Sequence, residues 1–345
     1  MARNGTGILL IYTGGTIGMV RDYGSGSLRA FDFNNLLQQI PELHQLDCRI
    51  DTVAFANPID SSNMDLPHWQ QLATLIGEHY DRYDGFVVLH GSDTMSYTAS
   101  ALSFMLENLA KPVILTGSQL PIGDLRTDAK ENLITSIQIA ALSEGGEPLV
   151  REVCLYFEYK LFRGNRTTKV NTEHFEAFDS PNYPPLAVSG VHLKVRKEAL
   201  WRTPRKSALK VRTDLVNQVG VVRLFPGMHP DWLRHQLGAP GLKGVVLETF
   251  GAGNAPSAPW LLDALREAAG RGLHIVNVTQ CSGGSVLMGR YETSSGLLDI
   301  PLIDGRDITS EAALAKLMYL LGSSVSPKSF KTIFESPLRG EMSQN

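Results

Sequence analysis

Five predicted strands of this chain end in short glycine-containing segments, and four of these segments also contain hydroxyl side chains. These segments are Thr13–Thr16, His90–Thr94, Thr116–Gln119, Gly251–Asn254 and Thr279–Gly284. In an open α/β sheet, ligands bind outside the carboxyl ends of the strands. One glycine turn after a strand is ordinary turn chemistry, whereas several on one sheet edge indicate a binding or catalytic site.

The motifs that announce cofactor or metal chemistry are absent. The sequence contains no GxGxxG, GxxxxGK[ST], HExxH or GxSxG, and the partial Gly251-Ala-Gly253 turn lacks a third glycine. No His, Asp and Glu cluster has ligand spacing, so we predict no metal and no cofactor. Catalysis then depends on nucleophilic attack by threonine or serine, a general base, and backbone N–H groups that stabilise an oxyanion.

Composition bounds the function class. The chain has 345 residues, which favours about two domains, and a net charge of −3 from 32 basic and 35 acidic residues. We therefore predict no nucleic-acid or membrane partner. The three cysteines lie far apart, which favours a reducing compartment, and we predict a cytoplasmic protein.

Short apolar runs alternate with amphipathic ones, which is typical of an α/β protein with parallel strands. The expected strands are 8–12, 85–90, 113–116, 153–157, 219–225, 244–249 and 274–279. The expected helices are 67–80, 99–109, 129–142, 232–237, 260–269 and 311–321, with a further helix capped by Ser326-Pro327.

The fold class predicted is two α/β domains, a larger N-terminal one with a mostly parallel sheet flanked by helices and a smaller C-terminal one with a parallel sheet. We place the domains at residues 1–192 and 215–345, joined by a linker at 193–214. That linker is strongly basic. We interpret it as a solvated segment and not a nucleic-acid patch, because base-stacking aromatic residues are not interleaved.

Three motifs together resemble the bacterial-type L-asparaginases, and the type I, cytoplasmic branch in particular. They are Thr13-Gly-Gly-Thr-Ile-Gly-Met19, His90-Gly-Ser-Asp-Thr-Met95 and Arg163-Gly-Asn-Arg-Thr-Thr-Lys169. The similarity runs from about residue 8 to beyond residue 320, with the motifs in family order. Amide-transferring relatives carry an added N-terminal domain, so the position of the first strand favours a stand-alone hydrolase.

The resemblance implies hydrolysis of L-asparagine to L-aspartate and ammonia through an acyl-enzyme. Thr16 matches the family nucleophile, and Ser92, Asp93 and Lys169 match the second catalytic cluster. Ser92 is a departure, because the family usually has threonine there and serine lacks the methyl group that restricts the rotamer. Without the other motifs, we would interpret Thr16 as a residue that caps its turn. Lys169 could likewise be a structural ion pair with Asp93.

The resemblance also implies how substrate is held. Asp93 matches the contact to the substrate ammonium, and Ser61 and Ser62 match the α-carboxylate site, with backbone donors at Gly15 and Ser92. Asp60 is either a further substrate contact or a turn residue.

Two further features of the family concern a lid and a subunit interface. Residues 19–30 fit a mobile lid, and either Tyr23 from this lid or Tyr291 assists the nucleophile. Asn254 resembles a residue supplied across a dimer interface, so we expect a homodimer or a dimer of dimers.

Three alternatives remain open at the level of sequence. The first is a glutaminase-leaning amidohydrolase, because one extra methylene is rejected by only about 1–3 kcal/mol. The second is a non-catalytic amino-acid sensor on the same fold. The third is a nucleic-acid or amidotransferase partner that acts through the basic segment.

Overall fold

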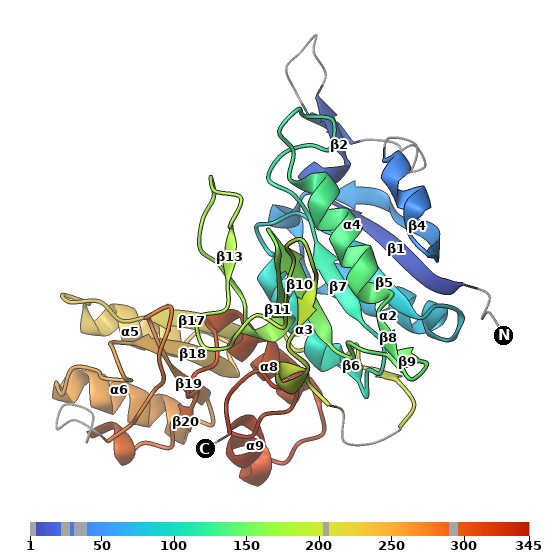
Figure 1. Cartoon of the computed structure of the whole chain (residues 1–345). Coiled ribbons are helices and arrows are strands. Elements are labelled where there is room, and N and C mark those ends of the chain that lie inside the picture. The colour runs from blue at the N-terminus through green and yellow to red at the C-terminus, as the bar shows by residue number, and fades with distance from the viewer. Residues whose placement is uncertain (1–4, 22–27, 31–39, 203–206, 290–295, 345) are drawn as a thin grey trace. The chain divides into compact units, whose positions relative to one another are not determined.

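The computed structural model describes residues 5–21, 28–30, 40–202, 207–289 and 296–344. The chain forms two compact units, Met1–Thr213 and Asp214–Asn345, which are coloured blue to yellow and yellow to red in Figure 1. The two α/β units with mainly parallel sheets confirm the predicted fold class. No described helix is long and apolar enough to cross a membrane.

An eight-stranded sheet forms the centre of the first unit, in the order β15-β14-β11-β10-β7-β5-β1-β4. Five neighbouring strands run parallel: β4 (Cys48–Ile59), β1 (Thr6–Gly14), β5 (Gly85–Leu89), β7 (Val113–Thr116) and β10 (Val153–Phe157). Three antiparallel strands complete it: β11 (Lys160–Arg163), β14 (Ala187–Val188) and β15 (Lys194–Val195).

Helices cover both faces of this sheet. The side chains of Ile8, Leu10, Val87 and Leu89 alternate along their strands and form one apolar core with helix α4 (Ala129–Ala140). Helices α2 (Leu66–His79) and α3 (Met95–Met105) belong to the same unit and are linked to the strand ends by hydrogen bonds described below. Figure 1 shows α4 lying along the sheet.

The second unit contains a four-stranded parallel sheet in the order β17-β18-β19-β20. Its strands are β17 (Val219–Arg223), β18 (Gly244–Thr249), β19 (His274–Thr279) and β20 (Ile303–Asp304). Its helices are α5 (Pro230–Leu237), α6 (Pro259–Gly270), α8 (Ser310–Gly322) and α9 (Pro327–Phe334), and Ser326 caps α9 as predicted.

A fully buried ion pair fastens the end of the chain to the second unit. Lys316 on α8 pairs with Glu341, and neither side chain is exposed. Lys316 also donates to the Ser336 carbonyl at 2.7 Å, and Glu341 accepts the backbone N–H groups of Leu338 and Arg339. Burial lowers the pKa of Lys316. The charges of this pair are therefore compensated by each other and by the backbone.

The structure differs from the sequence predictions at strand β4 and helix α3. Strand β4 was not predicted, because it is an edge strand in which polar residues interrupt the apolar ones and only Phe55 is buried. Helix α3 begins at Met95 and not at Ala99, and Leu106–Glu107 forms a short strand (β6) where we expected helix. The polar side chains of Ser96 and Thr98 are buried in the first turn of α3, so a search for apolar residues at helical spacing does not include this turn.

The basic segment 193–214, expected to be a linker, is partly built into the first unit. It contributes β15 to the large sheet, and β16 (Lys210–Val211) pairs with β6. Lys197 lies 2.5 Å from Glu144, and Arg212 lies 3.9 Å from Glu107. Several of its positive charges therefore face carboxylates.

Candidate active site

The first strand ends in a turn that presents Thr16. Gly14 and Gly15 have φ values of +134° and +92°, which favour glycine, and a 3₁₀ turn (η1, Thr16–Gly18) follows directly. The Tyr12 hydroxyl donates to the Gly18 carbonyl at 3.2 Å, and burial raises the pKa of Tyr12 to about 12, so it keeps its proton. The hydrogen bond from Tyr12 therefore ties strand β1 to the end of the turn that contains Thr16.

The two threonines of this turn differ in their environment. The buried Thr13 hydroxyl donates to the Leu89 carbonyl of β5 at 2.9 Å, which is a structural role. Thr16 is half-buried, and its hydroxyl has no hydrogen-bond partner among the described residues. Thr16 is therefore the threonine whose hydroxyl remains available for chemistry.

Backbone contacts hold three loops together beside Thr16. A Cβ added to Gly15 would lie 2.5 Å from the Gly91 nitrogen, and one added to Gly91 would lie 2.5 Å from the Ser61 hydroxyl oxygen. Real Cβ atoms essentially never approach so closely. The loops that follow the carboxyl ends of β1, β5 and β4 are therefore in contact with one another.

Lys169, Ser92 and Asp93 form one hydrogen-bonded group. Lys169 Nζ lies 2.8 Å from Ser92 Oγ and 2.7 Å from Asp93 Oδ1. Ser92 and Asp93 follow β5, whereas Lys169 comes from a short ribbon of β12 (Thr168–Lys169) and β13 (Phe178–Asp179). The side chain of Lys169 is 16% exposed and that of Asp93 is 58% exposed.

The segment after β4 completes the group. Asp60 caps a 3₁₀ turn (η4, Ser61–Asn63) by accepting the Ser62 backbone N–H at 2.8 Å, and this bond holds the pKa of Asp60 below its usual value. The Ser62 hydroxyl points to Asp93 Oδ2 at 3.5 Å, and Thr94 donates to the Ser61 carbonyl at 2.8 Å. In this structure Asp60 has the geometry of a turn residue.

Gln119, after β7, links the group to another loop. Its Oε1 lies 3.3 Å from the Ser92 hydroxyl, and its Nε2 lies 3.2 Å from the carbonyls of Thr172 and His174. The carboxylate of Asp128 accepts the backbone N–H groups of Gln119 and Leu120. Gln119 and Thr94 belong to strand-end segments that the sequence singled out, although neither was assigned a role in the predicted site, and nothing in the sequence indicated Asp128.

His90 is a structural residue. His90 Nδ1 lies 2.6 Å from the Gly91 carbonyl, which can only accept, so Nδ1 carries the ring proton and donates it there. Nε2 of the neutral ring is then an acceptor, and the Thr98 hydroxyl, which accepts from Trp69 at 2.9 Å, donates to it at 2.9 Å. Burial lowers the pKa of His90 to about 4. With both nitrogens occupied and the ring neutral, His90 is not placed to act as the base of a Ser-His-Asp triad.

The remaining predicted residues lie elsewhere. Tyr23 and Tyr291, and most of the expected lid, are outside the described residues. Asn254 lies in the second unit, in the turn after β18, where its backbone pairs with Phe250. Its Oδ1 is buried without a hydrogen-bond partner among the described residues. No group of three or more metal-binding side chains occurs in the described part of the chain.

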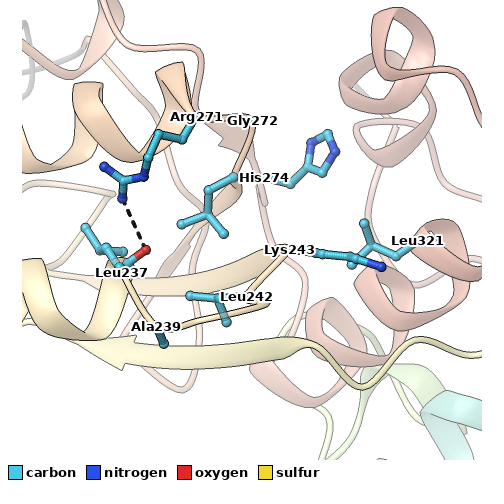
Figure 2. Close-up of a pocket in the computed structure, with 10 residues that line it drawn as sticks. Leu237, Ala239, Leu242, Lys243, Arg271, Gly272, His274 and Leu321 are labelled. Carbon is cyan, nitrogen blue, oxygen red and sulfur yellow. Dashed lines mark hydrogen bonds between the residues drawn. The ribbon is translucent and has the colours of Figure 1, made fainter.

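A separate cavity of about 330 Å³ lies in the second unit, beside Lys243 and His274 at the amino ends of β18 and β19 (Figure 2). The C-terminal ends of α5, α6 and α8 line it, and Arg271 donates to the Leu237 carbonyl at 3.4 Å. Cations stabilise helix C-termini, which accounts for Arg271 and Lys243 at this position. The residues that line it include no hydroxyl or carboxylate side chain, unlike the strand-end group of the first unit.

The fold and the strand-end group define a class: a two-domain α/β protein with hydroxyl groups and a lysine–carboxylate pair at the edge of a parallel sheet. Residues 7–201 match the N-terminal asparaginase domain, and residues 218–334 match the glutaminase/asparaginase C-terminal domain. The chain belongs to the asparaginase family, as predicted.

Individual relatives agree with this assignment. The chain is 43% identical to L-asparaginase 1 of Escherichia coli (strain K12) over 336 residues, which cover 97% of each chain. The solved L-asparaginase I of Vibrio cholerae matches with a TM-score of 0.89 and 41% identity, over 98% of this chain and 99% of that chain. The chain is also 44% identical to the 60 kDa lysophospholipase of Mus musculus, over 97% of this chain and 62% of that protein.

Proposed function

We propose that this protein hydrolyses the side-chain amide of L-asparagine to give L-aspartate and ammonia. The observation that carries the proposal is the hydrogen-bonded group of Lys169, Ser92 and Asp93. Gly91, which precedes Ser92, packs against Gly15 in the turn that presents Thr16. Two-step acyl transfer requires an available nucleophile and polar groups beside it. Here these groups are the Thr16 hydroxyl and a lysine that is hydrogen-bonded to the Ser92 hydroxyl. The relatives named as L-asparaginases support the choice of substrate.

The reaction proceeds through an acyl-threonine. Thr16 Oγ bonds to the amide carbon, the C–N bond breaks, and the nitrogen leaves as ammonia with the proton that Thr16 gave up. Water then bonds to the same carbon, the Oγ–C bond breaks, and the water proton returns to Thr16. Backbone N–H groups at the Gly15 and Ser92 turns stabilise the negative oxygen in both steps. The Ser92 hydroxyl, which accepts a hydrogen bond from Lys169, positions the attacking water.

Substrate recognition uses the charges of free asparagine. Asp93 takes the α-ammonium, because its carboxylate is still half-exposed while its other contacts are Lys169 and Ser62. Ser61 and Ser62 take the α-carboxylate with hydroxyl and backbone donors. Asp60 keeps this turn in shape.

Several finer points belong to the same proposal. Tyr23 or Tyr291 assists Thr16, and Asn254 completes the site of a second subunit, so the active form is a homodimer or a dimer of dimers. The partner of Asn254 Oδ1 then comes from outside the described residues of one chain. We expect a cytoplasmic enzyme that needs no metal or cofactor.

The test is ammonia release from L-asparagine and L-glutamine at equal concentration. Thr16→Ala should abolish release, whereas Thr74→Ala, the same change on the exposed face of α2, should leave it unchanged. Rapid quenching of the wild type with asparagine should show an aspartyl adduct on the peptide that contains Thr16. Undiminished release by Thr16→Ala would move the nucleophile to Ser92, and no release by folded wild type would refute the hydrolase proposal.

The ratio of the two amides separates the alternatives within the enzyme class. A pocket fitted to asparagine rejects the extra methylene of glutamine by about 1–3 kcal/mol. A release rate that is higher with glutamine would identify a glutaminase. Binding of asparagine without turnover would identify an amino-acid sensor.

A further inference from the structure

The amide of Gln119 has only one chemically consistent orientation. Two of its neighbours, the carbonyl oxygens of Thr172 and His174, are acceptors and cannot donate. The NH₂ group must therefore face these carbonyls, since an oxygen there would leave both without a donor. Oε1 then faces the Ser92 hydroxyl at 3.3 Å.

This orientation fixes the direction of the hydrogen bonds at Ser92. An amide oxygen only accepts, so Ser92 donates its single proton to Gln119. The nitrogen of Lys169, at 2.8 Å, donates to Ser92 Oγ. A hydroxyl oxygen has two acceptor positions, so one remains after the bond from Lys169. Ser92 is thus available as an acceptor and not as a donor.

The backbone of Gln119 is held by hydrogen bonds to the buried carboxylate of Asp128. Asp128, 6% exposed, accepts the Gln119 N–H with both oxygens at 2.9 and 3.1 Å and the Leu120 N–H at 3.1 Å. Asn132 donates to Asp128 at 3.2 Å and to the Gly117 carbonyl at 3.0 Å. The backbone of Gln119 is therefore fixed at both ends of its loop, and its side chain joins Ser92 to the 172–174 segment.

We propose that Gln119 is a positioning residue that fixes the rotamer of Ser92 and commits its hydroxyl as an acceptor for the attacking water. Serine lacks the β-methyl group that limits the side-chain rotamers of threonine, so its orientation depends on its partners. Gln119 supplies this restraint by accepting the Ser92 proton. This inference rests on the proposed function, because it concerns how Ser92 positions water in that reaction.

The test is a double-mutant cycle between Gln119→Met and Ser92→Thr. Methionine keeps the length of glutamine but offers no amide oxygen, so kcat should fall about tenfold, the rate equivalent of one hydrogen bond, while KM changes less than about twofold. In the Ser92→Thr background the methyl group restricts the rotamer, and the loss should shrink to about twofold. Gln138→Met, on the exposed face of α4, is the matched control and should match the wild type.

Two results would overturn the proposal. An unchanged kcat in folded Gln119→Met would show that Ser92 needs no restraint. An equal loss in both backgrounds would show that Gln119 does not act through Ser92.

A second measurement does not depend on activity. Crystal structures of wild type and Gln119→Met should show one Ser92 rotamer in the former and several in the latter, and a single unchanged rotamer in both would contradict the proposal. An inactive wild type would refute the proposed function, whereas the rotamer comparison would still decide the role of Gln119.

Discussion

Gly15→Ala should disable the site by separating two loops. The added Cβ would lie 2.5 Å from the Gly91 nitrogen, and ordinary contact begins at 3.4 Å, so the loops must move apart by 3.4 − 2.5 = 0.9 Å. Misplacement of reacting groups by about 1 Å can cost about 100-fold in rate. We therefore expect kcat for ammonia release to fall about 100-fold. The φ of +92° adds strain of about 1–3 kcal/mol for a residue with a Cβ.

Gly227→Ala separates strain from collision. Gly227 has a similar φ of +88°, but nothing lies within 4 Å of its added Cβ. Urea unfolding should show destabilisation of both variants, and ammonia release should be lost only in Gly15→Ala. The reasoning fails if folded Gly15→Ala retains kcat within about threefold of wild type, because the loop contact would then not position Thr16.

Three further predictions concern buried charge and pH. Because His90 is neutral in the folded state down to about pH 4 but titrates near 6.5 when unfolded, wild type should lose about 3 kcal/mol relative to His90→Gln between pH 7 and pH 4, measured by urea unfolding. Glu341→Gln should cost about 3–5 kcal/mol by leaving Lys316 buried without its carboxylate, and Lys316→Met with Glu341→Gln should recover most of it; equal losses in both would contradict this. Burial and nearby carboxylates raise the pKa of Glu158 from 4.5 to about 7, so the folded state keeps this proton at pH values where the unfolded chain has lost it. The resulting stabilisation of the folded state is lost as the pH rises from about 4.5 to about 7. Glu158→Gln should therefore raise Tm at pH 8 but not at pH 4.5.

The parallel strands were predictable because their residues are apolar and buried on both faces. Val113–Thr116, Val153–Phe157 and Gly244–Thr249 have the bounds that the sequence indicated. Strand β4 pairs only with β1, and its exposed polar residues give it no such signal. Apolar periodicity also could not locate the first turn of α3, because its buried side chains include the polar Ser96 and Thr98, which are hydrogen-bonded inside the protein.

The site was predictable from sequence only in part. Hydroxyls and glycines after strands indicated the region of Thr16 and Ser92 on physical grounds. Spacing could not indicate Lys169, which lies 77 residues from Ser92 on a separate two-stranded ribbon; the family resemblance supplied it. Gln119 acts through hydrogen-bond direction, and a sequence does not contain that information.

The exposure of Asp93 has a consequence for selectivity among small molecules. More than half of its side chain faces water, while its partner Lys169 is largely covered. Any occupant of the site must remove water from this carboxylate, and a dehydrated charge is costly unless another charge replaces the water. Asparagine brings an ammonium group for this purpose, whereas succinamate, the same amide without the amino group, brings none. In the proposed reaction, amides without a neighbouring positive charge would therefore be poor substrates, because they do not replace the water that Asp93 loses.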